Sequence, residues 1–417
     1  MTPQAKPRQN LISLRTVLIV PFILEIALAV GLTGWLSIHN GSRAIEDLAG
    51  QLKVELTHRI HLHLDQYLGT PHNLGQTNEA AFVDGILDPQ DLDTIGKHFW
   101  KQMQVFPVGY MSFGNPEGQF IGVGRMKDGR LSIDEKPELT PESPVYFYDT
   151  DDRGNRTQLR YQRSVYNPLI DRWYREPIEI GRPLWSPIYQ WPLWWQGYDS
   201  QPSIAASRPV YDETGNLLGV IGIELPLYQI DKFLQEVQLS PSAQVFVVER
   251  SGRMVASSNP EALQGETDSS SPLVQSTNSA EPLVRETAQF LQQHFGSLES
   301  IEQTEQLKFR ANGERQFLIV SPWQDEWGLD WLVVAVVPES DFMAQINANT
   351  RNTIVLCGVA LALAIGLGIV TARWINRPLQ RLSQASSDLA RGNLKRRVNE
   401  NRIQELSALS QAFNQMA

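Results

Sequence analysis

The residue types best suited to holding a small molecule are concentrated in one stretch, DRWYREPIEIGRPLWSPIYQWPLWW, which runs from Asp171 to Trp195. It contains five of the eleven tryptophans of the chain, with two tyrosines and three arginines. Aromatic rings supply large apolar contact areas and attract cations to their faces, and arginine binds carboxylates. No helical or strand period is visible in this stretch. It therefore predicts an aromatic wall, either of a ligand cavity or of a packing or partner surface.

Catalytic chemistry has little support in the sequence. There is no G-x-S-x-G nucleophile elbow and no metal-binding motif. His58, His61 and His63 lie close together on a predicted helix, which raises the question of a metal site. No cysteine or acidic ligand accompanies them at ligand spacing, and this favours a polar helix face. We therefore predict no enzyme activity in these residues, no metal site and no cofactor.

Two long apolar runs divide the 417-residue chain, at residues 16–38 and 353–373. Each is long enough, with its flanks, to cross a hydrocarbon core of about 30 Å as a helix. The first run could instead be a signal peptide. The absence of an A-x-A-like cleavage site and the helix predicted to follow favour a retained membrane anchor. We therefore predict two transmembrane helices.

The distribution of charge predicts the orientation in the membrane. Residues 1–15 carry three basic residues and no acid, and eight basic but only three acidic residues follow from Arg373 onward. The positive-inside rule therefore places residues 1–15 and 374–417 in the cytoplasm and residues 39–352 outside the inner (plasma) membrane. The net charge of the chain is −10. Since both ends are basic, the outer block is strongly acidic, and we expect it not to bind nucleic acid.

The outer block has an α+β pattern. Apolar residues recur every three or four positions from Ile45 to Leu68, which predicts a long amphipathic stalk helix within residues 39–75. Past Pro71, short runs rich in β-branched residues alternate with turns such as GNPEG, KDG and DETGN, which predicts antiparallel strands. A larger module at residues 76–238 and a smaller one at 239–340 are separated by a predicted helix near Leu227 to Val237.

The order of several phrases in this block resembles the double Cache extracellular sensors of bacteria. GRPLWSPIY and SIAASRPVYDETGNLLGVIGIEL stand in the larger module, and VFVVERSGRMVASSN and GLDWLVVAVVPESDFM stand in the smaller one. The resemblance covers about residues 40–350. It implies two PAS-like antiparallel-sheet modules, the larger of them distal to the membrane.

The C-terminal residues 374–417 contain two short amphipathic helices. We expect Pro378 to open the first, which carries Leu382 and Leu389, and the second carries Glu405, Leu409 and Phe413. The connector is RGNLKRRV, in which Gly392 should end the first helix and Leu394 and Val398 should anchor the loop. Two such helices cannot bury their apolar stripes alone, which predicts a four-helix bundle in a homodimer. This region resembles a HAMP domain, and the resemblance implies a signal relay through these residues.

The double Cache resemblance also implies a ligand pocket in the distal module. The positions that match its pocket motif are Trp173, Tyr174, Tyr189 and Glu224, to which we add Arg172 and Trp185 as candidate ligand-binding residues. Where the amino-acid-binding branch has an arginine two residues before the tryptophan, this chain has Asp171. If the stretch is extended, Arg172 points away from Trp173 and does not substitute for that arginine. Trp191, Trp194 and Trp195 remain candidates for a packing or partner surface.

These features predict a transmembrane receptor that senses a small polar or cationic ligand outside the cell. The signal would pass through the HAMP-like region to a cytoplasmic output domain or kinase. The resemblance fits the sensor half of a histidine kinase of a two-component system, a nucleotide cyclase or a chemoreceptor, with the output beyond Ala417 or on a separate chain. An amino acid is the less favoured ligand. The alternative is a membrane-anchored adhesion or partner-binding protein that uses the tryptophan-rich surface, although such a protein would have no use for a HAMP-like region.

Overall fold

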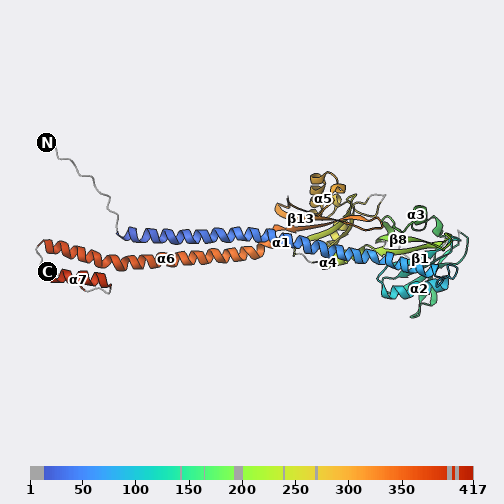
Figure 1. The fold of residues 1–417 in the computed structure, drawn as a ribbon, viewed down its shortest axis with the longest axis horizontal. Coiled ribbons are helices and arrows are strands. Elements are labelled where there is room, and N and C mark those ends of the chain that lie inside the picture. The colour runs from blue at the N-terminus through green and yellow to red at the C-terminus, as the bar shows by residue number, and fades with distance from the viewer. Residues whose placement is uncertain are drawn as a thin grey trace. The chain divides into compact units, whose positions relative to one another are not determined.

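The computed structural model describes residues 14–140, 143–163, 165–191, 201–237, 240–267, 271–391, 397–399 and 403–416 (Figure 1). The chain divides into two compact units. One unit comprises Leu48–Asp341, and the other comprises Met1–Asp47 together with Phe342–Ala417. The larger unit has the predicted α+β class, with antiparallel sheets and flanking helices.

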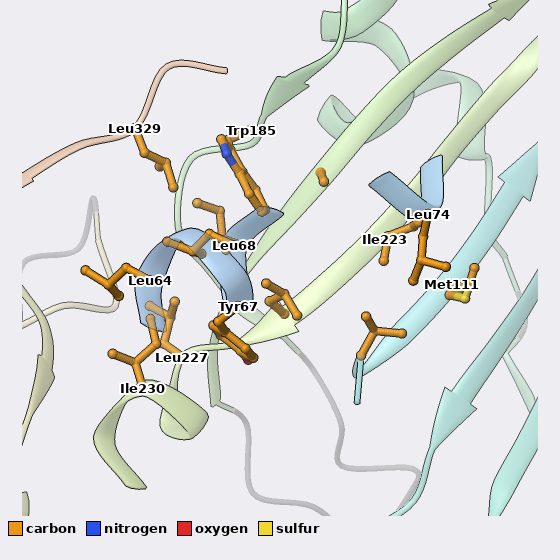
Figure 2. Packing of buried hydrophobic residues seen from close by; sticks show 14 of the residues in the cluster. Leu64, Tyr67, Leu68, Leu74, Met111, Trp185, Ile223, Leu227, Ile230 and Leu329 are labelled. Carbon is orange, nitrogen blue, oxygen red and sulfur yellow. The ribbon is translucent and has the colours of Figure 1, made fainter. Parts of the chain in front are cut away.

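The first helix, α1 (Leu14–Val83), is longer than the predicted stalk. We expected the helical pattern to end near Pro71, but the helix continues for twelve residues past it. A second helix, α2 (Leu92–Val105), then precedes the first strand. Proline removes one hydrogen bond from a helix, but buried side chains on both sides of Pro71, Leu68 and Leu74, hold α1 against the protein core. Figure 2 shows this packing, in which α1 contacts the helix after the larger sheet and two strands of that sheet through Leu64, Tyr67, Leu68, Leu74, Met111, Ile223, Leu227 and Ile230.

The larger sheet has nine antiparallel strands in the order β5-β4-β3-β2-β1-β9-β8-β6, with β7 also paired to β8. α2 packs on β2 and β3 through Ile95, Phe99 and Met103, which are fully buried. The strands are β1 (Tyr110–Gly114), β2 (Phe120–Arg125), β3 (Leu131–Lys136), β4 (Val145–Thr150), β5 (Arg156–Arg163), β6 (Leu184–Trp185), β7 (Tyr189–Trp191), β8 (Gln201–Tyr211) and β9 (Leu217–Pro226).

The smaller sheet has five antiparallel strands in the order β11-β10-β14-β13-β12. Alternate residues of β14 enter two different cores, since Val333 belongs to the core shared with α1 whereas Val334 belongs to a second core that includes α5. Burial on both faces explains the nearly continuous apolar run of this strand. The strands are β10 (Gln244–Glu249), β11 (Met254–Ser257), β12 (Glu305–Ala311), β13 (Glu314–Gln324) and β14 (Asp330–Pro338).

Short helices connect the strands of the larger unit. The helix predicted near Leu227 to Val237 is α4 (Tyr228–Glu236), and α5 (Pro282–Phe295) covers the smaller sheet. The remaining elements are α3 (Arg172–Ile180) and the 3-10 helices η1 (Pro168–Ile170), η3 (Pro260–Leu263), η4 (Ser276–Asn278) and η5 (Leu298–Ser300).

The other unit, over the residues that the structure describes beyond Asp341, consists mainly of two helices. α6 (Glu339–Ala390) runs through Pro378, so the prediction that this proline opens a helix is wrong. Part of α6, Arg351–Ala390, is long and apolar enough to cross a membrane, whereas the first apolar run provides only a shorter apolar segment, Ile23–Leu36. α6 packs against α7 (Gln404–Met416) through Leu382, Ala385 and Phe413, with Leu389 and Val398 alongside. The predicted connector residues Gly392 and Leu394 lie outside the described residues.

Candidate ligand-binding site

A cavity of about 950 Å³ lies on the larger sheet. Its floor comes from β1, β2, β4 and β9, and its walls come from the start of α3 and the segment from Ser186 to Gln190. Thr267, Ser271 and Pro272, which follow β11 in the chain, close another side. The volume is within the range of small-molecule sites, and six of the nineteen lining residues are aromatic.

Two glycines of the floor allow aromatic rings to lie against the sheet. Gly122 of β2 lies beneath the hydroxyl of Tyr110, and a Cβ atom at this position would overlap that group. Gly222 of β9 lies beneath Trp173, where a Cβ atom would be only 2.9 Å from Cε3 of the indole ring. Glycine is therefore required at both positions for the rings to lie flat on the strands.

Glu224 is the acidic group of the floor. It lies near the end of β9, opposite Tyr110 of β1 and Ala205 of β8, and only 6% of it is exposed. The Tyr189 hydroxyl donates a hydrogen bond to its carboxylate. Burial raises the pKa of Glu224 well above its usual range, the nearby charge of Asp171 also raises this pKa, and the hydrogen bond from Tyr189 opposes them. An added positive charge in the cavity would stabilise the ionised form.

Asp171 provides a second carboxyl group. Its side chain makes no capping hydrogen bond to α3, and it accepts hydrogen bonds from Tyr166 and Trp173 instead. The indole nitrogen of Trp173 also lies 3.2 Å from the Tyr166 hydroxyl oxygen, to which it donates. Burial raises the pKa of Asp171, whereas these hydrogen bonds and the charge of Arg163 lower it. Arg163 itself is exposed and lies over the ring of Tyr166, 5.2 Å from its centre.

A third carboxyl group lies on the cavity face of the sheet, covered by Tyr110. Asp134 of β3 has no exposed surface, and it accepts hydrogen bonds from the Tyr110 hydroxyl at 3.0 Å and the Ser132 hydroxyl at 3.2 Å. Burial raises the pKa of Asp134 to about 7, and both hydrogen bonds oppose this shift. Asp134 thus fixes the orientation of Tyr110, which lines the cavity.

The structure brings four of the six predicted ligand residues to the cavity, namely Arg172, Trp173, Tyr189 and Glu224. Arg172 is at its margin, with a largely exposed side chain that pairs with Glu176 at 2.5 Å. Tyr174 and Trp185 are not part of the lining. Tyr174 is buried beside Gly114, on the face of α3 that covers the sheet, and Trp185 belongs to the core and donates a hydrogen bond to Asp325.

The assumption that residues 171–175 are extended was wrong. Residues Arg172–Ile180 form α3, and adjacent residues on a helix differ by about 100°, so both Arg172 and Trp173 reach the cavity. The sequence contains signals for this helix in two i,i+4 ion pairs, Arg172–Glu176 and Arg175–Glu179, and in Gly181, which ends the helix with a φ of 75°. Pro177 lies inside the helix, and a proline at such a position normally argues against a helix, so these signals were outweighed.

Several lining residues were not predicted. They are the aromatic residues Tyr110, Phe120, Phe147 and Tyr166, together with Asp171, which we had treated only as a missing arginine. The sequence did contain one signal for a polar site on this sheet, namely an acid, Asp134, within a strand pattern, because a carboxyl group on a strand needs a hydrogen-bond donor such as Tyr110. Of the possible tryptophan surface, Trp194, Trp195 and the side chain of Trp191 lie outside the described residues.

Comparison with known proteins assigns the fold. Residues 41–346 match the Cache domain family and residues 370–417 match the HAMP domain family. The first match covers most of the chain, and the protein therefore belongs to the Cache domain family. A Cache sensor followed by a HAMP domain defines a membrane receptor that transduces a signal from an extracellular sensor, as the sequence predicted.

Solved structures similar to this chain include two sensor domains of chemoreceptors. The ligand-binding domain of Campylobacter jejuni Tlp3, in complex with 4-methylisoleucine, is 11% identical, with a TM-score of 0.46 over 72% of this chain and 93% of that one. The ligand-binding domain of the Pseudomonas aeruginosa PAO1 amino acid chemoreceptor PctC, in complex with GABA, is 17% identical, with a TM-score of 0.42 over 68% of this chain and 96% of that one.

Proposed function

We propose that this receptor binds a small cationic molecule in the cavity of the larger sheet. The observation that carries the proposal is the presence of two carboxyl groups among aromatic rings, Glu224, which is buried, and Asp171, which is half-buried. Aromatic faces and carboxylates attract the same kind of ligand, one with an ammonium or similar positively charged group. The two arginines of the lining, Arg163 and Arg172, are exposed at the margin.

The electrostatics of the cavity favour such a ligand over an anion or an amino acid. Burial is costly for a carboxylate, which is why the pKa values of both groups are raised, although the charge of Arg163 partly opposes this shift at Asp171. A bound cation would supply a further counter-charge inside a region of low dielectric constant. A ligand carboxylate would instead meet two acids, and Arg172 is already paired with Glu176.

The receptor architecture that we propose follows the predicted domain limits. Spans at residues 16–38 and 353–373 would leave both termini in the cytoplasm. The outer region, 39–352, would comprise a stalk helix at 39–75, a distal module at 76–238 and a proximal module at 239–340. The HAMP domain at 374–417 would pair with a second copy and act on a cytoplasmic output. The two sheets and the apolar segment of α6 support this division.

The proposal can be tested with the full-length protein in lipid nanodiscs, screened by thermal shift against panels of amines, quaternary ammonium ions, amino acids and dicarboxylates. We expect stabilisation by members of the cationic panels. A ligand at 100 times its dissociation constant should add about 2.7 kcal/mol to the free energy of unfolding. Glu224→Gln keeps an acceptor for Tyr189 but removes the charge, so this variant should lose most of the shift, as should Asp171→Asn.

Glu179→Gln provides a matched control. It removes a carboxylate from the same helix, but Glu179 pairs with Arg175 at 3.0 Å, and neither residue is part of the cavity lining. This variant should respond to cations like the wild type. Stabilisation only by dicarboxylates, or a cation response that survives both Glu224→Gln and Asp171→Asn, would contradict the proposal.

A further inference from the structure

Trp185 lies directly before the cavity wall in the chain, yet it faces the other way. Residues Ser186 to Gln190 line the cavity, whereas Trp185 is buried in the core that also contains Leu68 of α1 and Leu329 (Figure 2). Its indole nitrogen donates a hydrogen bond to Oδ2 of Asp325 at 2.5 Å. Asp325 belongs to the turn between β13 and β14 of the smaller sheet. One short segment thus contacts both the cavity and the smaller sheet.

The same carboxylate organises that turn. Oδ1 of Asp325 accepts hydrogen bonds from the backbone N–H groups of Trp327, Gly328 and Leu329 at 3.0, 2.8 and 2.8 Å. Because the two oxygens belong to one rigid group, a displacement of Trp185 that moves Oδ2 also changes the acceptor of the turn. Hydrogen bonds to a charged group are about twice as strong as neutral ones, so the link can transmit force.

His72 of α1 holds the two tryptophans of this region together. Its ring stacks on Trp327, with centroids 4.0 Å apart, and meets Trp185 edge-on at 4.6 Å. Burial, with the charge of Arg208, lowers the pKa of His72 to about 3, so the ring is neutral at physiological pH. Trp185 and the turn are therefore packed around one uncharged ring and have little freedom to move separately.

We propose that the Trp185–Asp325 hydrogen bond is the connection through which the cavity wall acts on the β13–β14 turn. β14 ends at Pro338 and α6 begins at Glu339, so the turn, the strand and the helix that contains the apolar segment are consecutive in the chain. The inference rests on the proposed function, in which a ligand shifts the wall. Trp185 acts here as a positioning residue for the turn and not as a ligand contact.

Other contacts join the smaller sheet to α4 and α1 without involving the wall. Asp231 of α4 accepts a hydrogen bond from the backbone N–H of Ser257 at 2.8 Å, and Trp323 of β13 donates one to Asp65 of α1 at 2.8 Å. Neither pair includes a residue of the cavity lining. The second contact is useful because it is also a bond from an indole N–H to a carboxylate and involves the same hairpin.

The test measures amide hydrogen exchange at residues 327–329 in the full-length protein in nanodiscs, without any ligand. Tyr189→Ala releases the wall from Glu224 and should speed exchange in the turn roughly fivefold, the change expected when one hydrogen bond is weakened. Trp185→Phe keeps an aromatic ring in the core but removes the N–H donor. In the Trp185→Phe background, Tyr189→Ala should produce no additional change in the turn.

Trp323→Phe is the matched control, and in this background Tyr189→Ala should still affect the turn. Asp325→Asn provides a second way to break the link, since a single acceptor oxygen cannot serve both the turn and Trp185. An unchanged turn in Tyr189→Ala, or an equal effect with and without the Trp185 donor, overturns the connection. Since no ligand is used, either result is independent of whether the cavity binds a cation.

Discussion

At the level of single residues, Asp134 has the most distinctive environment, because its carboxyl group is fully buried beneath Tyr110 of the cavity lining. Its pKa is raised from 3.8 to about 7, so the folded protein binds a proton that the unfolded chain has lost in this interval. The free energy of unfolding therefore falls as the pH rises from about 4 to about 7. Three pKa units correspond to at most about 4 kcal/mol.

Asp134→Asn should remove this part of the pH dependence. The amide oxygen can still accept the hydrogen bond from Tyr110, and no proton is exchanged. We expect the variant to lose less stability than the wild type between pH 4 and pH 8, as measured by urea unfolding. Asp212→Asn is the control: the pKa of this surface aspartate is lowered to about 2 by hydrogen bonds from Asn216 and Thr214, so its substitution should not flatten the slope. Equal slopes in wild type and Asp134→Asn would show that Asp134 does not titrate in this range.

At the level of elements, the sequence predicted the strands well and the helices less well. The run of β9 and the hairpin of β10 and β11 follow from alternating apolar residues between turns. The apolar stripe from Ile45 to Leu68 also predicted part of α1. The full length of α1, however, depends on tertiary packing that offsets Pro71, and the same is true of α3 with its buried Pro177. Proline is a local signal, whereas burial depends on residues distant in the sequence.

The candidate site shows the same limit. Trp173, Tyr189 and Glu224 could be predicted because they stand in phrases that resemble a known family. The positions of Tyr110 and Tyr166 in the cavity could not, since they depend on which strands are neighbours and on where the chain crosses the sheet. Trp185 was added to the candidate ligand-binding residues as part of the tryptophan-rich stretch, but it lies in the core, whereas Ser186, which follows it, lines the cavity.

Gly222, the glycine of β9 beneath Trp173, gives a prediction at the scale of elements. Gly222→Ala would place a methyl group 2.9 Å from the ring of Trp173 and 2.8 Å from the Ser112 hydroxyl oxygen. We expect Trp173 to be displaced, the free energy of unfolding to fall by about 1–3 kcal/mol, and the thermal shift given by a cationic ligand to decrease. In Gly69→Ala, on α1, the nearest atom is 3.9 Å away, so this control should be neutral or slightly stabilising. Wild-type stability and binding in Gly222→Ala would contradict the proposed position of Trp173.

At the level of the whole molecule, the HAMP region of one chain buries only part of its apolar surface. Leu382 and Phe413 pack together, and the side chain of Asn414 bonds to the backbone N–H and C=O of Val398 at 2.9 and 2.8 Å. Leu409, one helical turn before Phe413 at the edge of this packed face of α7, is 53% exposed. Burying a leucine side chain contributes about 1.5–3 kcal/mol, so an exposed leucine in a heptad pattern favours association. A second copy of the chain would cover it.

We therefore expect Leu409→Cys to form disulfide-linked dimers in native membranes. The background is Cys357→Ala, which removes the only native cysteine. Disulfides require Cα atoms within about 7 Å, so fast cross-linking reports a close approach of the two α7 helices. Leu382→Cys should react more slowly than Leu409→Cys, because Leu382 is covered by Phe413 of its own chain. Gln384→Cys, at an exposed position on α6, is the control for random collisions. If Gln384→Cys cross-links and Leu409→Cys stays monomeric, the exposed face of α7 is not the contact between two copies, and the HAMP region must associate in another way.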